Sequence, residues 1–149
     1  MFDLQGNPLA FSSTAYQTTF PKPGWAEQNP QDWWEALGKS VKNSISEAGI
    51  SSSAVAAICL DTTCCSVVAL DENGDPLRPC LIWMDLRSAP QTEKVLATGD
   101  KALRVNSNGQ GPVSAEWMIP KSLWIKENEP DLFETVSYTH LRAHETDRY

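Results

Sequence analysis

The sequence predicts an α/β protein, and three observations support that prediction. Residues 30–48 carry an amphipathic helix pattern with clear start and stop signals. Residues 54–60 form a continuous apolar run, which is typical of a strand covered on both faces of a sheet. Strand and helix patterns then alternate, with no internal repeat or low-complexity tract. At 149 residues the chain is long enough for one domain with a core.

The first twenty residues, "MFDLQGNPLAFSSTAYQTTF", predict two strands joined by a turn. Phe2 and Leu4 alternate with polar residues before the turn at residues 6–8, and an extended pattern resumes over residues 11–20. A hairpin that opens a chain without a further partner strand is poorly stabilised. We therefore expect these to be the second and third strands of a sheet whose first strand is missing.

The loop "PKPGWAEQNP" leads into the helix expected over residues 30–48. Asn29 can cap it, Pro30 suits its first position, and Gly49 can end it. One face carries apolar side chains at helical spacing, which predicts a core-facing helix. These are Trp34, Leu37, Val41, Ile45 and Ala48.

The second half of the chain predicts shorter elements. After the strand at 54–60 we expect strands over 66–70 and 81–84, separated by a turn at Asn73-Gly74. Ser88 can cap a helix over about residues 89–98. A short helix and a glycine-rich loop should follow in "GDKALRVNSNGQGP", then a helix over 114–127 and another helical turn within "ENEPDLF".

Composition excludes several classes of function. A formal net charge of −7 argues against a nucleic-acid binder, which needs a basic face. No run approaches the roughly 20 apolar residues of a membrane span. The N-terminus lacks the basic and apolar regions of a secretion signal. We therefore expect a cytoplasmic protein with no membrane or nucleic-acid partner.

The stretch "LDTTCCS" raises three alternatives: a metal site, a redox pair or a substrate-contacting loop. The four cysteines, at positions 59, 64, 65 and 80, lack the CxxC spacing of a zinc site. The chain also lacks the small, loop-rich, secreted character of a disulfide framework. We expect all four to be reduced, with no metal bound.

The C-terminal segment, "VSYTHLRAHETDRY", resembles a translated sequencing adapter. The alternative is a natural helical tail in which His140 and His144 lie one turn apart and could bind metal. We expect residues 1–135 to be the domain and residues 136–149 to be a non-native tail.

No P-loop, GxGxxG, nucleophile elbow or HExxH motif is present. Three blocks in order are nevertheless similar to the N-terminal domain of the FGGY carbohydrate kinases: "PGWAEQNPQDWWEAL", "AICLDTTCCSVVALDENGDPLRPCLIWMDLRS" and "SAEWMIPKSLWIKENEPDLF". The blocks "DTTCCS" and "SAEWMIPK" most resemble the ribulokinase branch. The resemblance implies a ribonuclease H-like, actin-like ATPase fold, with ATP and a sugar held between two domains.

The resemblance also implies that residues of this chain line one wall of the sugar-binding cleft. Polar residues at the carboxyl end of a buried strand suit this task, and Asp61, Thr62, Thr63, Cys64 and Cys65 follow the strand expected at 54–60. The two cysteines would line the pocket through shape and backbone. The alternative is that the two threonines only cap the turn.

Three further residues match family positions. Asp85 and Arg87 in "WMDLR" would order the cleft wall or reach a sugar hydroxyl; the alternative is a pair that only ties the strand to the next helix. Glu116 in "SAEW" could accept two sugar hydroxyls; the alternative is a solvated helix residue.

The chain also departs from the family pattern. The phosphate-binding first strand, the catalytic aspartate and the adenosine-binding domain are absent, so we expect no catalytic or cofactor-binding residue here. The full-length enzyme would use ATP and Mg²⁺ to phosphorylate a ketose or polyol such as ribulose, while the fragment alone would bind neither and be inactive. A homodimer is left open. The rival is a non-catalytic actin-like module that binds a sugar or a partner.

Overall fold

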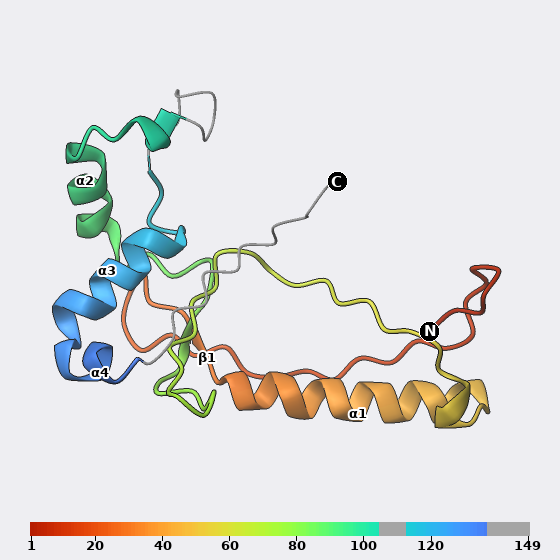
Figure 1. Cartoon of the computed structure of the whole chain (residues 1–149). Helices are drawn as coiled ribbons and strands as arrows, with labels where there is room; N and C mark the ends of the chain where they lie inside the picture. Colours follow the sequence, from red (N-terminus) through yellow and green to blue (C-terminus); the bar gives the residue numbers. More distant parts are fainter. Residues whose placement is uncertain (105–112, 137–149) are drawn as a thin grey trace.

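The computed structural model describes residues 1–104 and 113–136. Figure 1 shows a long helix, α1 (Pro30–Ala48), with the extended N-terminal residues running along it. At its N-terminal end lies a compact group of helices: α2 (Ala89–Ala97), α3 (Met118–Asn128) and α4 (Pro130–Thr135). Two short 3₁₀ helices, η1 (Ser52–Ala54) and η2 (Lys101–Arg104), complete the helical elements of the described residues.

The sheet is small within these residues. Strand β1 (Glu27–Gln28) pairs antiparallel with β2 (Cys80–Leu81), in the register Glu27 to Leu81 and Gln28 to Cys80. Single bridges extend the pairing from Thr19 to Glu27 and from Val67 to Leu81. The strand expected at 66–70 is reduced to isolated bridges at Val67 and Leu70, and the strand expected at 81–84 is the two-residue β2, Cys80–Leu81. Beyond Leu81 the chain turns, and the Asp85 N–H donates to the Ile82 carbonyl at 2.9 Å.

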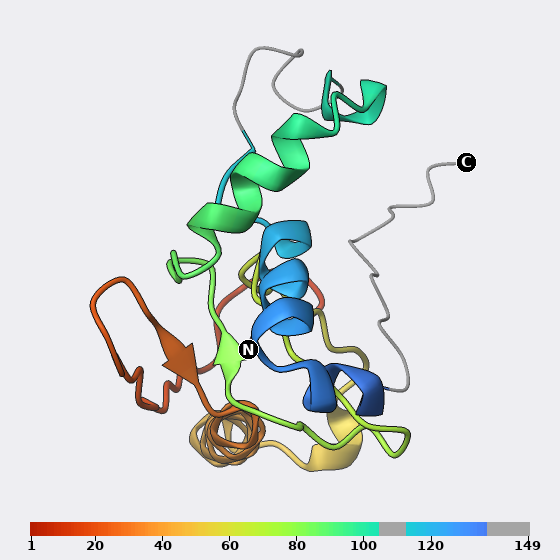
Figure 2. The ribbon, with the colours of Figure 1, turned by 90° about the vertical axis from the view of Figure 1, so that its left-hand side faces the viewer.

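The core lies on the two sides of this ladder. On one side Ala26, Cys80 and Ile82 pack with Trp33 and Val68. The other side is formed by Leu81 together with residues of α3 and α4, the side on which Figure 2 shows these helices. Its members are Trp25, Val67, Leu81, Trp124, Ile125, Leu132 and Phe133. The core therefore joins the first and last described segments of the chain.

Helix α1 begins and ends as predicted. The Asn29 side chain accepts a hydrogen bond from the Gln31 N–H at 3.1 Å, and Gly49 adopts a left-handed conformation with φ of 65°. The expectation that its apolar stripe faces a core is wrong for the described residues, since Trp34 is 72% exposed and Leu37 is 40% exposed. The neighbouring extended segment instead meets another face, where Ser40 donates to Thr14 at 2.8 Å.

The strand predicted at residues 54–60 does not form, and its side chains are exposed. Ile58 is 73% exposed and Leu60 is 66% exposed. A strand needs a partner for its N–H and C=O groups, and no backbone hydrogen bond within the described residues joins this run to a neighbouring strand. Figure 1 shows the run as an extended stretch away from α1.

Other local predictions vary in outcome. The turn at Asn73-Gly74 is confirmed, with Gly74 at φ of 85°, and α4 confirms the extra helical turn. Helix α3 begins at Met118 rather than at residue 114, because residues 114–117 form a turn in which the Trp117 N–H donates to the Ser114 carbonyl. The short helix expected after residue 98 is η2, and the glycine-rich loop lies outside the described residues.

We predict that Asn29→Ala lowers the free energy of unfolding by about 1 kcal/mol, because the substitution removes the acceptor that caps α1. Thermal or urea unfolding measures the change. Asn43→Ala, the same substitution at an exposed site inside α1, is the control and should not destabilise the protein. Equal losses in the two variants would contradict the capping role.

Candidate functional site

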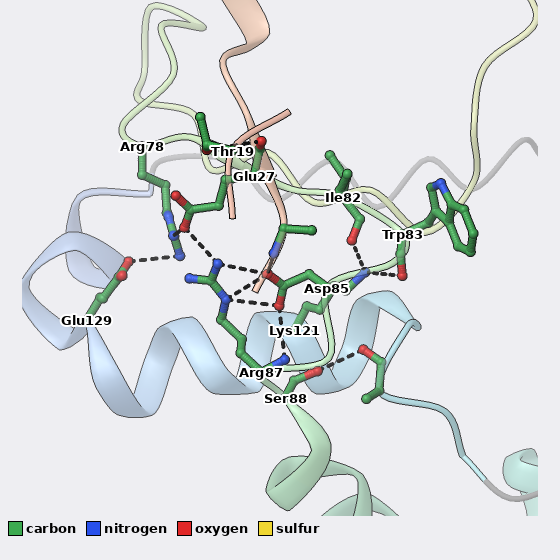
Figure 3. Close-up of polar contacts among 12 residues, drawn as sticks. Thr19, Glu27, Arg78, Ile82, Trp83, Asp85, Arg87, Ser88, Lys121 and Glu129 are labelled. Atoms are coloured by element: carbon green, nitrogen blue, oxygen red, sulfur yellow. Dashed lines mark hydrogen bonds and ion pairs between the residues drawn. The ribbon is translucent and has the colours of Figure 1, made fainter. Parts of the chain in front are cut away.

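A buried carboxylate lies where the chain turns after β2. The Asp85 side chain is fully buried, and its Oδ2 accepts a hydrogen bond from the Ala26 N–H at 2.6 Å. Its Oδ1 accepts from the Arg87 backbone N–H at 3.0 Å and from Arg87 Nε at 2.9 Å. Arg87 Nη2 also reaches Oδ2 at 2.8 Å. Asp85 therefore joins the segment before β1 to the loop after β2 (Figure 3).

Arg87 extends this contact into an ion-pair network. Its Nη2 donates to Glu27 Oε1 at 2.7 Å, and Arg78 Nη2 donates to the same oxygen at 2.8 Å. Arg78 Nη1 also lies 3.2 Å from Glu129 Oε2, so the network reaches the start of α4. Burial lowers the pKa of Arg78, and Glu129 is the largest of the nearby charges that oppose this shift.

Two tryptophans enclose the guanidinium of Arg87. Its carbon lies 3.7 Å from the Trp25 ring centroid and 5.0 Å from that of Trp124. The two rings meet edge to face at 5.4 Å. Such cation–π contacts gain strength when water is excluded. Arg87 is thus held by charge, hydrogen bonds and ring faces together.

A second buried cation, Lys121, lies one turn into α3. It is fully buried, and its Nζ donates to three backbone carbonyls: Cys65 at 2.9 Å, Ile82 at 2.7 Å and Trp83 at 3.1 Å. Burial lowers the pKa of Lys121, and the carboxylate of Asp85 is the largest opposing influence. The lysine therefore joins the loop after residue 60 to the end of the β2 segment. Figure 3 shows its bonds to the Ile82 and Trp83 carbonyls.

The predicted sugar loop is open to solvent. Residues 61–64 are exposed and Cys65 is half-buried. Cys65 has φ of 63°, a left-handed conformation that is costly for a residue with a Cβ. Within the described residues no hydrogen bond fixes the side chains of Asp61, Thr62 or Thr63; the contact that anchors the loop is from Lys121 to the Cys65 carbonyl.

Glu116 lies in the turn before α3 and is half-buried. Its backbone N–H donates to Ser114 Oγ at 3.1 Å. Ser88 Oγ donates to the Ala115 carbonyl at 2.8 Å, so the start of α2 is tied to this turn. Ser88 therefore occupies the cap position of α2 without the capping hydrogen bond that its position predicts.

The structure brings the three family blocks together: Asp85 in the second block accepts a hydrogen bond from the Ala26 N–H in the first, and the second and third blocks meet at backbone carbonyls. Lys121 binds the carbonyls of Cys65 and Trp83, and Ser88 binds that of Ala115, one residue before Glu116. Two surface hollows, of about 230 and 260 Å³, lie elsewhere, beside α1 and between α3 and α4. Direct sugar contact by Asp61, Thr62, Thr63, Cys64, Cys65 or Glu116 stays a prediction.

Two roles are predicted for Asp85 and Arg87: ordering the cleft wall or reaching a sugar hydroxyl. Both side chains have no exposed surface, and they bond to each other, to Ala26 and to Glu27. A direct bond from either one to a sugar hydroxyl stays a prediction. The outside partners of the pair lie at and before β1 rather than in α2, so tying the strand to the next helix also stays a prediction.

Sequence reasoning missed Lys121, Glu27 and Arg78. A signal existed for Lys121, since it falls on a face of α3 whose other members, Pro120, Trp124 and Ile125, are apolar and buried. A lysine in such a position is almost never fully buried unless its ammonium is paired. Glu27 and Arg78 gave no comparable local signal, because their partners are distant in sequence.

Among residues 1–104 and 113–136, no group of three histidine, cysteine or acidic residues is arranged to hold a metal ion. The four cysteines are free. Burial raises the pKa of the Cys80 thiol to about 12, so that thiol stays neutral near pH 7. No helix in the described part of the chain has the length and apolar character to cross a membrane.

Comparison with solved structures identifies the fold class of the chain. The chain aligns with a xyloylose kinase from Brucella ovis with a TM-score of 0.82 and 27% identity, covering 91% of this chain and 28% of that one. A xylulose kinase from Rhodospirillum rubrum aligns with a TM-score of 0.70 and 27% identity, over 81% of this chain and 25% of that one. These neighbours confirm the α/β fold as that of a ribonuclease H-like, actin-like N-terminal domain.

Comparison with sequences gives the family. Residues 1–145 match the model of the FGGY family of carbohydrate kinases, N-terminal domain. The chain is 32% identical to a xylulose kinase of Bacillus subtilis, covering 92% of this chain and 27% of the relative. It is 27% identical to a glycerol kinase of Burkholderia pseudomallei, covering 86% and 26%. The chain belongs to the FGGY family of carbohydrate kinases, and it spans about a quarter of these relatives' length.

We predict that Arg87→Met lowers the free energy of unfolding by about 3–5 kcal/mol, because it leaves the Asp85 and Glu27 carboxylates buried without their shared cation. Urea unfolding measures this loss. Lys94→Met breaks an exposed pair with Glu127 and should cost no more than about 1 kcal/mol. A loss below that of the control would show that the buried network does not stabilise the fold.

Proposed function

We propose that this chain is the sugar-side part of an ATP-dependent kinase that phosphorylates a ketose or polyol such as ribulose. The observation that carries the proposal is the joining of the three family blocks, the first to the second through Asp85 and the second to the third through Lys121 and Ser88. Membership of the FGGY family supports the reaction class. The relatives' names, xylulose kinase and glycerol kinase, make xylulose and glycerol the first comparison substrates. The ribulokinase-like motifs favour ribulose.

Phosphoryl transfer from ATP to a sugar hydroxyl requires mainly the positioning of two partners and stabilisation of negative charge. The role of this part is positioning. The exposed polar residues 61–64 offer carboxylate, hydroxyl and backbone groups to the hydroxyls of a sugar. Glu116 can accept two hydroxyls, and a site built this way rejects analogues that leave its polar groups unpaired.

ATP and Mg²⁺ belong to the full-length enzyme in this proposal. One or two carboxylates together with substrate phosphate oxygens usually hold Mg²⁺ in such sites. We assign no catalytic, nucleotide or metal ligand to the described residues, because the family resemblance matches none of them to such a role. The chain alone should therefore be inactive, and the proton acceptor and adenosine site should come from other parts of the enzyme.

The exposed apolar surfaces support an incomplete domain. The run at 54–60 is apolar and includes the strand-favouring residues Val55 and Ile58, while α1 carries an apolar stripe at helical spacing. Yet Ile58, Leu60 and Trp34 face solvent. A strand inserted beside residues 54–60 would complete their backbone hydrogen bonds and bury their side chains. We propose that this is the first strand of the sheet, supplied by a segment before Met1.

Further parts of the proposal concern the whole protein. It places the enzyme in the cytoplasm and takes a homodimer as an option. It places the domain boundary at residue 135, with an adapter-derived tail over 136–149. Apart from Val136, that tail, including His140 and His144, lies outside the described residues. The sequence of the uninterrupted gene tests the boundary, because a natural gene would continue with a different sequence after residue 135.

The function is tested with the full-length protein from the uninterrupted gene. We expect ATP-dependent phosphorylation of at least one of ribulose, ribitol, xylulose and glycerol, measured by ADP release and by mass of the sugar phosphate. Ribulose should give the highest kcat/KM. An absence of turnover with all four, together with binding of one of them in calorimetry, would favour the non-catalytic module instead.

In that enzyme, Glu116→Ala should raise the KM for the sugar about 10- to 100-fold and leave the KM for ATP nearly unchanged. The expected size follows from the loss of charge-assisted hydrogen bonds worth about 1.5–3 kcal/mol. Steady-state kinetics with each substrate varied separately gives both constants. Glu93→Ala, an exposed glutamate on α2, is the control and should change neither constant. An unaltered sugar KM in Glu116→Ala would remove this residue from the site.

A further inference from the structure

The ammonium group of Lys121 is buried, and burial of a charged group carries a large desolvation free energy. A charged group without exposed surface loses its hydration and must be compensated by hydrogen bonds. Lys121 uses its three N–H donors on three carbonyls, at 2.7 to 3.1 Å. No acidic side chain within the described residues forms an ion pair with it. Its task is therefore to hold backbone rather than to neutralise a carboxylate.

The three carbonyls come from two separate parts of the chain. Ile82 and Trp83 follow β2, whose ladder is fixed by mutual hydrogen bonds with Val67 at 2.9 and 3.0 Å. Cys65 belongs to the exposed segment that precedes Val67. Figure 3 shows the lysine reaching from α3 to the carbonyls of Ile82 and Trp83. Lys121 thus anchors an otherwise loosely held loop to a rigid ladder.

The backbone of Cys65 needs such an anchor. Cys65 is the only non-glycine residue with positive φ in the part of the chain that the structure describes, at 63°. A left-handed conformation costs such a residue about 1–2 kcal/mol, so it persists where surrounding contacts impose it. The hydrogen bond from Lys121 to the Cys65 carbonyl is the contact that fixes this residue from outside its own loop.

We propose that Lys121 is a positioning residue for substrate, which sets the place of the Thr62–Cys65 loop relative to Trp83 and so determines affinity for the sugar. The inference rests on the proposed function, because it assumes that this loop contacts the sugar. Lys121 itself has no exposed surface and touches no substrate. It acts through the backbone of Cys65, while the side chains of the exposed loop remain free to meet hydroxyl groups.

The opposing explanation is that Lys121 only stabilises the core. Ile125 gives a matched control, because it lies one turn further along α3, is 3% exposed and packs against Leu81 without a hydrogen bond to the loop. Lys121→Met and Ile125→Ala should both lower Tm. Only Lys121→Met should alter the sugar side of the kinetics.

The experiment uses the full-length protein with ATP and the sugar it turns over. For Lys121→Met we expect kcat/KM for the sugar to fall about 10- to 100-fold, the scale on which small misplacements reduce rate, while the KM for ATP changes less than about twofold. Lys121→Gln keeps one N–H donor group and should fall between Lys121→Met and the unsubstituted protein. If Lys121→Met fails to fold, Lys121→Gln provides the test in its place. An equal fall in Ile125→Ala at a similar Tm, or no fall in either Lys121 variant, would overturn the proposal.

A second readout does not depend on activity. Native alkylation with iodoacetamide, localised by mass spectrometry, should modify the half-buried Cys65 faster in both Lys121 variants than in Ile125→Ala and in the unsubstituted protein. If the unsubstituted protein has no kinase activity but this difference is present, the proposed function fails and the anchoring of the loop stands. If the Cys65 rates are equal in all variants, the anchoring itself is wrong.

Discussion

The carboxylate of Asp85 is the group on which the arrangement of the described residues depends. A fully buried carboxylate is costly unless its oxygens are paired, and Asp85 satisfies them with the Ala26 N–H and the Arg87 guanidinium. Because Ala26 lies beside β1 and Arg87 lies after β2, these bonds fix the register of two segments that are about sixty residues apart. The two-residue strands alone would give little such constraint.

The two buried cations, Arg87 and Lys121, bind different kinds of acceptor. Arg87 has a planar group, and it joins carboxylates while lying on the faces of Trp25 and Trp124. Lys121 has a compact ammonium with three donors, and it joins carbonyls. Neither could replace the other without losing its hydrogen-bond geometry. Together they connect β1, the segment after β2, the loop at residue 65 and α3.

Prediction from sequence succeeded where the determinants are local. Asn29, Pro30 and Gly49 lie next to the ends they define, so the limits of α1 could be read directly. It failed for residues 54–60, because an apolar run becomes a strand only when another strand satisfies its backbone, and the described residues supply none. Ser88 shows the same limit: local rules predicted a cap, but its hydroxyl bonds to Ala115, a residue far along the chain.

The sequence predicted which residues belong to the candidate site better than it predicted the contacts that these residues make. Family resemblance pointed to Asp85 and Arg87, but the depth at which they lie is set by Glu27 and the tryptophans, which no short motif links to them. Membership of the FGGY family explains why the blocks recur in order. The geometry adds that backbone carbonyls, which a sequence does not display, are the groups through which the second and third blocks meet.

The open segment at residues 54–60 has a consequence for handling the molecule. Its seven residues, "AVAAICL", include no charge, no proline and no glycine, and all of them are exposed. Unpaired strands of this composition form intermolecular β-structure readily. Preparations of this polypeptide by itself should therefore tend toward aggregates held by that stretch, and placing a lysine within it would improve solubility.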